Sequence, residues 1–174
     1  CSSVPKKIKS LNVEEYSFPT IKQSIKIYPS TGGKILNSSL NFDIINKLQP
    51  NYYEERLTVD NNSFFNFLFR SLDQNKVFSK IVMINEGSDL ELISYISHQS
   101  FVPSIVKLNH QVELKVRYIL IKKNKAIFNK EISSIGISSV GDNFVGHNRH
   151  IEAYLSAISK NIFQFYELLK KENF

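Results

Sequence analysis

One stretch of the sequence decides the fold: residues 110–138, which read HQVELKVRYILIKKNKAIFNKEISSIGIS. Its first half alternates between apolar and polar side chains, which is typical of a β-strand with one buried and one wet face. The apolar set is Val112, Leu114, Val116, Tyr118 and Leu120, and the polar set is Gln111, Glu113, Lys115 and Arg117. The polar turn KKNK then leads into a second apolar run, so the two runs predict an antiparallel hairpin.

Shorter runs before the hairpin predict further strands. In TIKQSIKIYP, residues 20–29, the isoleucines fall on one parity and Lys22, Ser24 and Lys26 on the other, as in a half-buried strand. KIVMI at 80–84 and DLELISYIS at 89–97 read as two more strands. Residues 52–59 could form an edge strand or an extended connection.

Two segments predict long helices. DNNSFFNFLFRSLDQ, residues 60–74, opens with capping side chains and then leaves little polar face. Residues 147–173 space their apolar side chains by three and four, as in an amphipathic helix of about six turns. A short third helix is expected within 36–48. The predicted fold is therefore α+β, with a mixed, largely antiparallel sheet of four to five strands and two or three helices packed on one face.

Length and composition bound the class of protein. The chain has 174 residues, 42% of them hydrophobic, which suits one folded domain, expected over 20–174. The formal charge of +6 favours anionic partners such as phospholipid headgroups, lipopolysaccharide or acidic glycans. The single cysteine excludes an internal disulfide, a four-cysteine zinc cluster and a CxxC redox pair.

That cysteine, Cys1, stands at the first position, in the stretch CSSVPKKIKS at residues 1–10. Mature bacterial lipoproteins resemble this arrangement, since they begin at a cysteine that carries acyl chains. Each buried CH₂ of such chains contributes about 0.8 kcal/mol to anchoring, and nearby lysines add to it. We therefore expect residues 1–19 to be a lipidated tether. Ser2, in place of the aspartate that retains lipoproteins in the inner membrane, favours the inner leaflet of the outer membrane.

The predicted hairpin carries a group of basic residues, which we call the basic hairpin set: Lys115, Arg117, Lys122, Lys123, Lys125 and Lys130. This set is the candidate site for an anionic partner, lipopolysaccharide included. An ordinary solvated face, whose lysines discourage edge aggregation, explains the same residues equally well. Nucleic acid is not expected, because exposed aromatic residues are not interleaved with the charges as stacking platforms.

Catalytic chemistry is not expected. His147 and His150 lie three residues apart and could share a helical face toward a metal, but a solvated helix entrance is the simpler reading. The sequence has no GxSxG motif, and adjacent carboxylates such as Glu54 and Glu55 would point to opposite faces of a strand. We expect neither an enzyme nor a bound metal or cofactor.

The segments SFFNFLFRSLDQNKVFSKIVMI, HQVELKVRYILIKKNKAIF and HIEAYLSAISKNIFQFYELL, in this order behind Cys1, resemble a group of Gram-negative outer-membrane lipoproteins. The group includes the lipopolysaccharide-assembly lipoprotein LptE, YajG-like lipoproteins and auxiliary lipoproteins of ABC-type transporters. The resemblance implies a lipid-anchored periplasmic accessory subunit that docks on a larger envelope complex for transport, secretion, lipopolysaccharide assembly or a motor ring. A binding module for an anionic envelope ligand and an unrecognised hydrolase are the alternatives.

Overall fold

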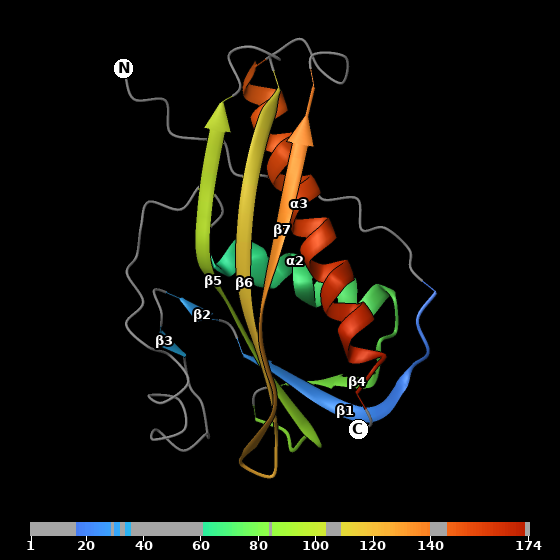
Figure 1. Ribbon diagram of the computed structural model, residues 1–174. Coiled ribbons are helices and arrows are strands. Elements are labelled where there is room, and N and C mark those ends of the chain that lie inside the picture. The colour runs from blue at the N-terminus through green and yellow to red at the C-terminus, as the bar shows by residue number, and fades with distance from the viewer. Residues whose placement is uncertain are drawn as a thin grey trace.

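A computed structural model describes residues 17–28, 30–31, 34–35, 61–83, 85–103, 109–139 and 146–172. Five strands form one sheet in the order β4-β1-β5-β6-β7 (Figure 1). Their bounds are Ile21–Tyr28 for β1, Phe78–Val82 for β4, Leu90–Pro103 for β5, His110–Lys122 for β6 and Lys125–Ser138 for β7. The short strands β2, Ser30–Thr31, and β3, Lys34–Ile35, pair with each other. The helices are α2, Asn61–Gln74, and α3, Gly146–Leu169.

The sheet is mixed. β1 runs parallel to both of its neighbours, β4 and β5, whereas β5, β6 and β7 form two long antiparallel ladders. Lys123 and Asn124 join β6 to β7 with φ angles of 48° and 59°, the left-handed pair that a two-residue hairpin of the I′ type requires. The predicted hairpin and the predicted α+β fold with a mixed five-stranded sheet are confirmed.

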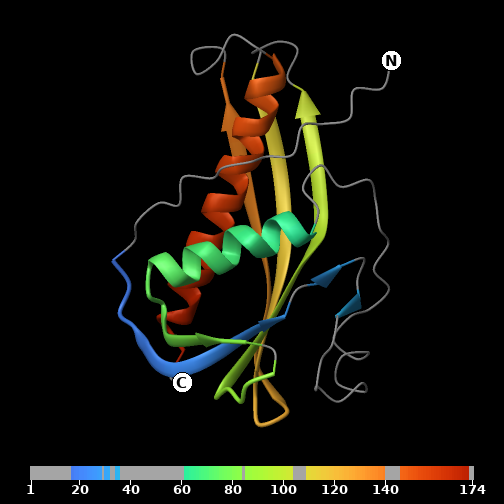
Figure 2. The same cartoon turned by 180° about the vertical axis from the view of Figure 1, so that it is seen from behind.

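Both helices lie on one face of the sheet, which we call the inner face (Figure 2). The even-numbered apolar residues of β6, from Val112 to Leu120, are fully buried there, as the alternation predicts. α3 runs along β6 and β7, and α2 crosses near it. The Tyr166 hydroxyl of α3 donates a 2.7 Å hydrogen bond to Ser71 Oγ of α2, which ties the two helices together.

α3 approaches β7 through a seam of small residues. A Cβ atom built on Gly136 of β7 would lie 1.8 Å from the Ala153 carbonyl oxygen and 2.5 Å from the Ala157 backbone nitrogen. Two residues before this glycine, Ser134 Oγ donates a 2.7 Å hydrogen bond to the Ala157 carbonyl. The backbones of strand and helix are therefore in direct contact, which only glycine at this position allows.

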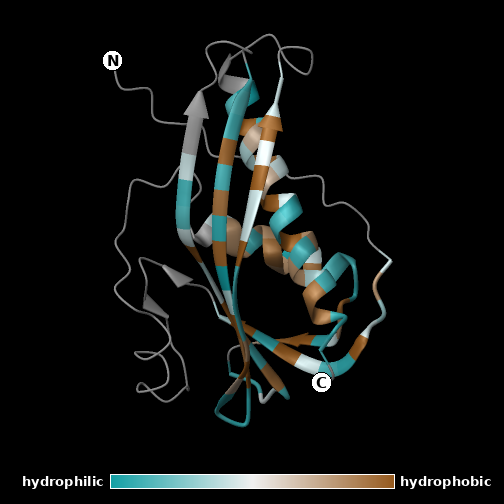
Figure 3. Cartoon of the chain, in the orientation of Figure 1, coloured by the Kyte–Doolittle hydropathy of each residue, from teal (hydrophilic) through white to brown (hydrophobic). Residues whose placement is uncertain are grey.

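The opposite, outer face has two parts. At the end where β1 meets β5 it holds a second buried group, the outer cluster, formed by Tyr28, Ile93, Tyr95, Ile119 and Ile121. Lys26, which the alternation of β1 placed on a wet face, is 5% exposed, so that expectation was wrong. Its Nζ lies 6.0 Å from the centre of the Tyr28 ring. Further along β6, polar residues alternate with apolar ones (Figure 3). The apolar residues face the helices, and the polar residues form the wet part of the outer face.

Several sequence-based predictions fall outside the described residues. These are the short helix within 36–48, the strand or connection at 52–59 and most of the predicted tether at 1–19. Phe18 is described, and its ring centre lies 5.6 Å from that of Tyr166 on α3. The domain boundaries stay predictions.

Candidate functional site

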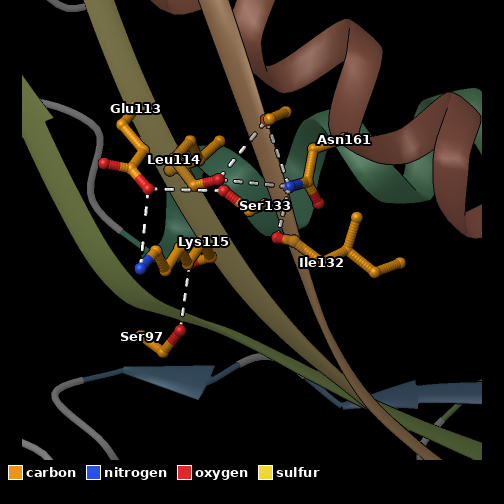
Figure 4. Close-up of polar contacts among 8 residues, drawn as sticks. Ser97, Glu113, Leu114, Lys115, Ile132, Ser133 and Asn161 are labelled. Atoms are coloured by element: carbon orange, nitrogen blue, oxygen red, sulfur yellow. Dashed lines mark hydrogen bonds and ion pairs between the residues drawn. The ribbon is translucent and has the colours of Figure 1, made fainter.

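The structure divides the basic hairpin set into three groups. On the outer face, Lys115 Nζ lies 3.5 Å from Glu113 Oε1 (Figure 4). Beside this pair, the Arg117 guanidinium donates to Asn129 Oδ1 at 3.1 Å and to Glu131 Oε2 at 3.4 Å. Each of these two basic side chains therefore has a carboxylate partner on the sheet itself.

Lys130 lies apart from them. Its Nζ forms a 3.1 Å ion pair with Glu172 Oε1, just beyond the end of α3, and lies 5.0 Å from the centre of the Phe128 ring. This lysine joins the sheet to the C-terminal end of α3. These contacts give Lys130 a structural role that needs no external partner.

The remaining members, Lys122, Lys123 and Lys125, lie at the turn. None of them forms an ion pair with a described carboxylate within 4.0 Å. Lys122 and Lys123 border a cavity of about 300 Å³, which we call the turn pocket. Its lining residues are Gln23, Ser88, Asp89, Glu91, Ile121, Lys122, Lys123 and Asn124.

The turn pocket forms where β1 and β5 begin beside the end of β6. Glu91 of β5 pairs in register with Ile121 of β6. The start of β5, which carries Glu91, therefore lies beside the end of β6, which carries Lys122. Asp89 Oδ2 accepts hydrogen bonds from the Ser24 backbone nitrogen at 2.8 Å and from Ser24 Oγ at 2.7 Å. These two bonds, with a smaller contribution from the charge of Lys122, lower the pKa of Asp89 below its usual value.

Three oxygen atoms of the turn pocket residues are buried without a hydrogen-bond partner: Gln23 Oε1, Ser88 Oγ and Glu91 Oε2. Buried polar atoms in folded proteins are nearly always paired, so an unpaired group needs an explanation. The pocket is therefore lined by two acidic residues and two lysines, and three oxygen atoms of its lining residues have no hydrogen-bond partner. Its two lysines were predicted as site residues from the sequence, whereas Gln23, Ser88, Asp89 and Glu91 were not.

A second candidate surface lies along β7. The strand pairs with β6 on one side and with no described strand on its other side. Three isoleucines on its outer face form what we call the isoleucine row: Ile127 (40% exposed), Ile135 (46%) and Ile137 (52%). Lys160 of α3 donates a 3.0 Å hydrogen bond to the Ile135 carbonyl oxygen. This contact occupies one backbone acceptor of an edge that pairs with no other described strand.

The polar side chain beneath α3 has a structural role. Asn161 is fully buried, and its Nδ2 donates to the Ile132 carbonyl at 2.8 Å and to Ser134 Oγ at 3.2 Å (Figure 4). Its Oδ1 accepts a 2.9 Å hydrogen bond from the Tyr118 hydroxyl. Burial raises the pKa of Tyr118 well above its usual value, and the neighbouring Tyr166 adds to this shift. This network fixes α3 on the sheet.

The histidines show no metal-binding arrangement in the described part of the chain. The ring centre of His150 lies 6.3 Å from that of His110 and 4.8 Å from that of Tyr154. The side chain of His147 lies outside the described residues. Within the described ranges, no group of three or more His, Cys, Asp or Glu side chains could hold a metal ion.

No described helix is both long enough and apolar enough to cross a membrane. Cys1 lies outside the described residues, so its acylation stays a prediction.

Comparison with known proteins gives the fold. No family model and no curated protein matches the chain. Among solved structures, the protein XCC0632 from Xanthomonas campestris, a DUF330 protein, matches with a TM-score of 0.56 and 8% identity. The match covers 94% of this chain and 97% of that one. The hypothetical protein CT253 from Chlamydia trachomatis matches with a TM-score of 0.50 and 9% identity, over 87% and 95% of the two chains.

A minor lipoprotein from Acinetobacter baumannii matches more loosely, with a TM-score of 0.45 and 11% identity, over 88% of this chain and 94% of that one. At identities this low, the first two matches show a shared fold and nothing finer. None of these three structures is named as an LptE-like or YajG-like protein, so that part of the resemblance stays a prediction.

Proposed function

We propose that the chain is a lipid-anchored accessory subunit that docks on a larger complex of the bacterial cell envelope and stabilises it. The observation that carries the proposal is the isoleucine row on the open edge strand β7. Large apolar side chains that are exposed along an edge strand, where no further described strand pairs, are typical of a surface that a protein partner covers. Transport, secretion, lipopolysaccharide assembly and a motor ring are the candidate settings.

The anchor of this proposal is the one expected from the sequence: acyl chains on Cys1, inserted in the inner leaflet of the outer membrane, with the domain facing the periplasm. A domain held in this way meets its partner in two dimensions, so a modest docking surface suffices. The DUF330 protein from Xanthomonas campestris matches nearly the whole chain, and the presence of this fold in a bacterium supports the proposed setting.

Affinity purification of the full chain from native membranes in mild detergent tests the docking step. The unaltered protein should carry a stoichiometric partner complex. The double variant Ile135→Asp/Ile137→Asp should lose that complex, because two charges cannot be buried against an apolar partner, yet keep its circular dichroism spectrum and melting temperature.

The matched control is Met83→Asp. Met83 is also apolar and 75% exposed, but it follows β4 at the other edge of the sheet. This variant should retain the complex. Retention of the complex by the double isoleucine variant would instead remove the isoleucine row from the interface.

The anchor needs its own test. Cys1→Ser in the expressed precursor should leave the domain folded and move it from the membrane fraction to the soluble fraction. Unchanged fractionation of Cys1→Ser would contradict the anchor and leave the docking surface to be judged separately.

The two alternative functions stay proposals of lower rank. Binding of an anionic ligand by the whole basic hairpin set is less favoured, because Lys115, Arg117 and Lys130 already have carboxylate partners. The hydrolase alternative has no observation in its favour among the described residues. Turnover that is lost on changing His147 or His150 would revive it.

A further inference from the structure

We propose that the turn pocket binds a small zwitterion of the phosphoethanolamine type, with the ammonium group at Glu91 and Asp89 and the phosphate at Lys122 and Lys123. The site does not depend on the isoleucine row or on the acylation of Cys1. It therefore goes beyond the proposed accessory role and can fail without affecting it.

The acceptor half of the pocket is the first argument. Gln23 Oε1, Ser88 Oγ and Glu91 Oε2 are shielded from solvent and make no hydrogen bond. Leaving buried acceptor oxygens unpaired is unfavourable. A ligand that donates hydrogen bonds to them gains the energy of these bonds and also removes the cost of the unpaired oxygens. An ammonium group carries up to three N–H donors, and small rotations of the three side chains would turn their oxygens toward it.

The basic half is the second argument. Lys123 has a φ of 48°, in the left-handed region that glycine and asparagine adopt easily and lysine does not. The next residue, Asn124, fits the turn at its φ of 59°. Among the described residues, the Lys123 side chain forms no ion pair with a carboxylate. Strained residues of this kind cluster at binding sites, which suggests that its ammonium is needed at the pocket mouth.

Charge balance selects the ligand class. Two acidic residues, Asp89 and Glu91, and two lysines, Lys122 and Lys123, line one cavity of about 300 Å³. An anion alone would leave the acceptor oxygens unpaired and would lie near two carboxylates. A metal cation would lie near two lysines, and the described residues hold no metal-binding group of three acidic, histidine or cysteine side chains. A ligand with one charge of each sign satisfies both halves.

The strand geometry suits a short link between the two ligand charges. Glu91 and Ile121 are register partners on neighbouring strands, and Lys122 follows directly. Neighbouring strands lie about 4.8 Å apart, so a ligand of this size can contact residues of both strands at this point. A phosphate also offers several acceptor oxygens, enough for both lysines and the Asn124 amide at once.

The experiment is a titration of the ¹⁵N-labelled full chain with free phosphoethanolamine, followed by NMR. We expect saturable shifts confined to the amides of residues 23, 88–91 and 121–124. Glu91→Gln and Lys123→Asn should each weaken binding by at least about tenfold, because each removes one charged hydrogen-bonding partner. Lys123→Asn should also raise the melting temperature, since asparagine tolerates the left-handed backbone better than lysine.

Matched controls separate the pocket from general charge effects. Lys125→Asn removes a lysine of the same turn that does not line the pocket, and Glu113→Gln removes a carboxylate elsewhere on the outer face; both should bind normally. Three results would overturn the proposal: no shifts with phosphoethanolamine, equal affinity for inorganic phosphate or ethanolamine alone, or normal binding by both Glu91→Gln and Lys123→Asn.

Vesicle flotation identifies the source of the ligand. Binding to phosphatidylethanolamine vesicles but not to phosphatidylcholine vesicles, with loss in Lys123→Asn, would assign the pocket to a lipid headgroup. Binding of the soluble compound without flotation would assign it to a free zwitterion. Either result upholds the zwitterion site, whereas flotation on both vesicle types that Lys123→Asn does not alter would count against it.

Discussion

The two faces of the sheet are built differently from the same strands. The inner face of β6 is buried from Val112 to Leu120 under α3, with backbone contact at Gly136. Among the described residues, the outer face is buried at the outer cluster and at Lys26, and beyond them it carries ion pairs such as Arg117 with Glu131. The inner face therefore specifies how the helices pack, whereas the outer face leaves room for contacts beyond the chain. We therefore expect substitutions on the inner face to lower the free energy of unfolding most, and substitutions on the wet part of the outer face to lower it least.

The largest effect is expected where the helix touches the strand. Gly136→Ala should cost more than about 3 kcal/mol of unfolding free energy, because the new methyl group meets the Ala153 carbonyl, which cannot move without shifting α3. Urea denaturation measures the loss. Gly87→Ala is the matched control: a Cβ at Gly87 has no atom within 4 Å, so its cost should stay within about 0.5 kcal/mol.

The outer cluster should contribute somewhat less per residue. Ile119→Ala removes three carbons from a fully buried site and should cost about 2–3 kcal/mol in the same denaturation experiment. Ile127→Ala makes the identical change at a residue that is 40% exposed and should cost under about 1 kcal/mol. Equal costs for the two variants would show that the outer cluster is not a core.

The buried phenol of Tyr118 should make stability depend on alkaline pH. Its pKa is raised in the folded state, so the folded protein retains the proton while the unfolded chain loses it above about pH 10. The stabilising effect of the raised pKa on the free energy of unfolding is thus fully present below about pH 10. Above that pH it is lost, and the free energy of unfolding falls by about 1.4 kcal/mol per pH unit.

Tyr118→Phe removes the ionisable phenol, and it also leaves the Asn161 amide oxygen without its donor. The loss of this hydrogen bond should lower the free energy of unfolding by about 1–2 kcal/mol at pH 7. Thermal unfolding of both proteins from pH 7 to 11 should show a shallower alkaline decline for the variant. Parallel declines would mean that Tyr118 ionises as readily folded as unfolded.

The smallest effect is expected on the wet part of the outer face. Arg117→Gln breaks a 3.4 Å ion pair between side chains that are 30% and 38% exposed. Such pairs are worth about 0.2–1 kcal/mol, less at high salt, so the loss should be near the lower limit in 0.5 M sodium chloride. A loss above that range would indicate that this face is more enclosed than the exposed fractions show.

Alternation along β6 and helical spacing in α2 and α3 were enough to predict the inner face, since each is a local property of the chain. The burial of the outer cluster could also have been predicted from the sequence. YILI at 118–121 is apolar without interruption, which is typical of a strand buried on both faces. Lys26 escaped prediction because its burial depends on neighbours far away in the sequence.

The pairing of charges could not be derived from the turn alone. At the turn Lys122 pairs with Lys125, and the same register carried along the hairpin would place Arg117 opposite Lys130. A bulge between Leu120 and Ile121 shifts the register by one residue and places Arg117 opposite Glu131 instead. Likewise, the turn pocket depends on the β5 to β6 register, which is set by contacts between distant segments.

The hydroxyl contact between Ser71 and Tyr166 joins residues 95 positions apart. Four strands of the sheet, β4 to β7, lie between them in the chain. α2 also contacts β4 and β5, but its bond to α3 cannot form until the last of these strands is in place and α3 docks. Contacts between segments this far apart in sequence slow folding, so the face of α2 that meets α3 should be among the last parts of the core to be covered.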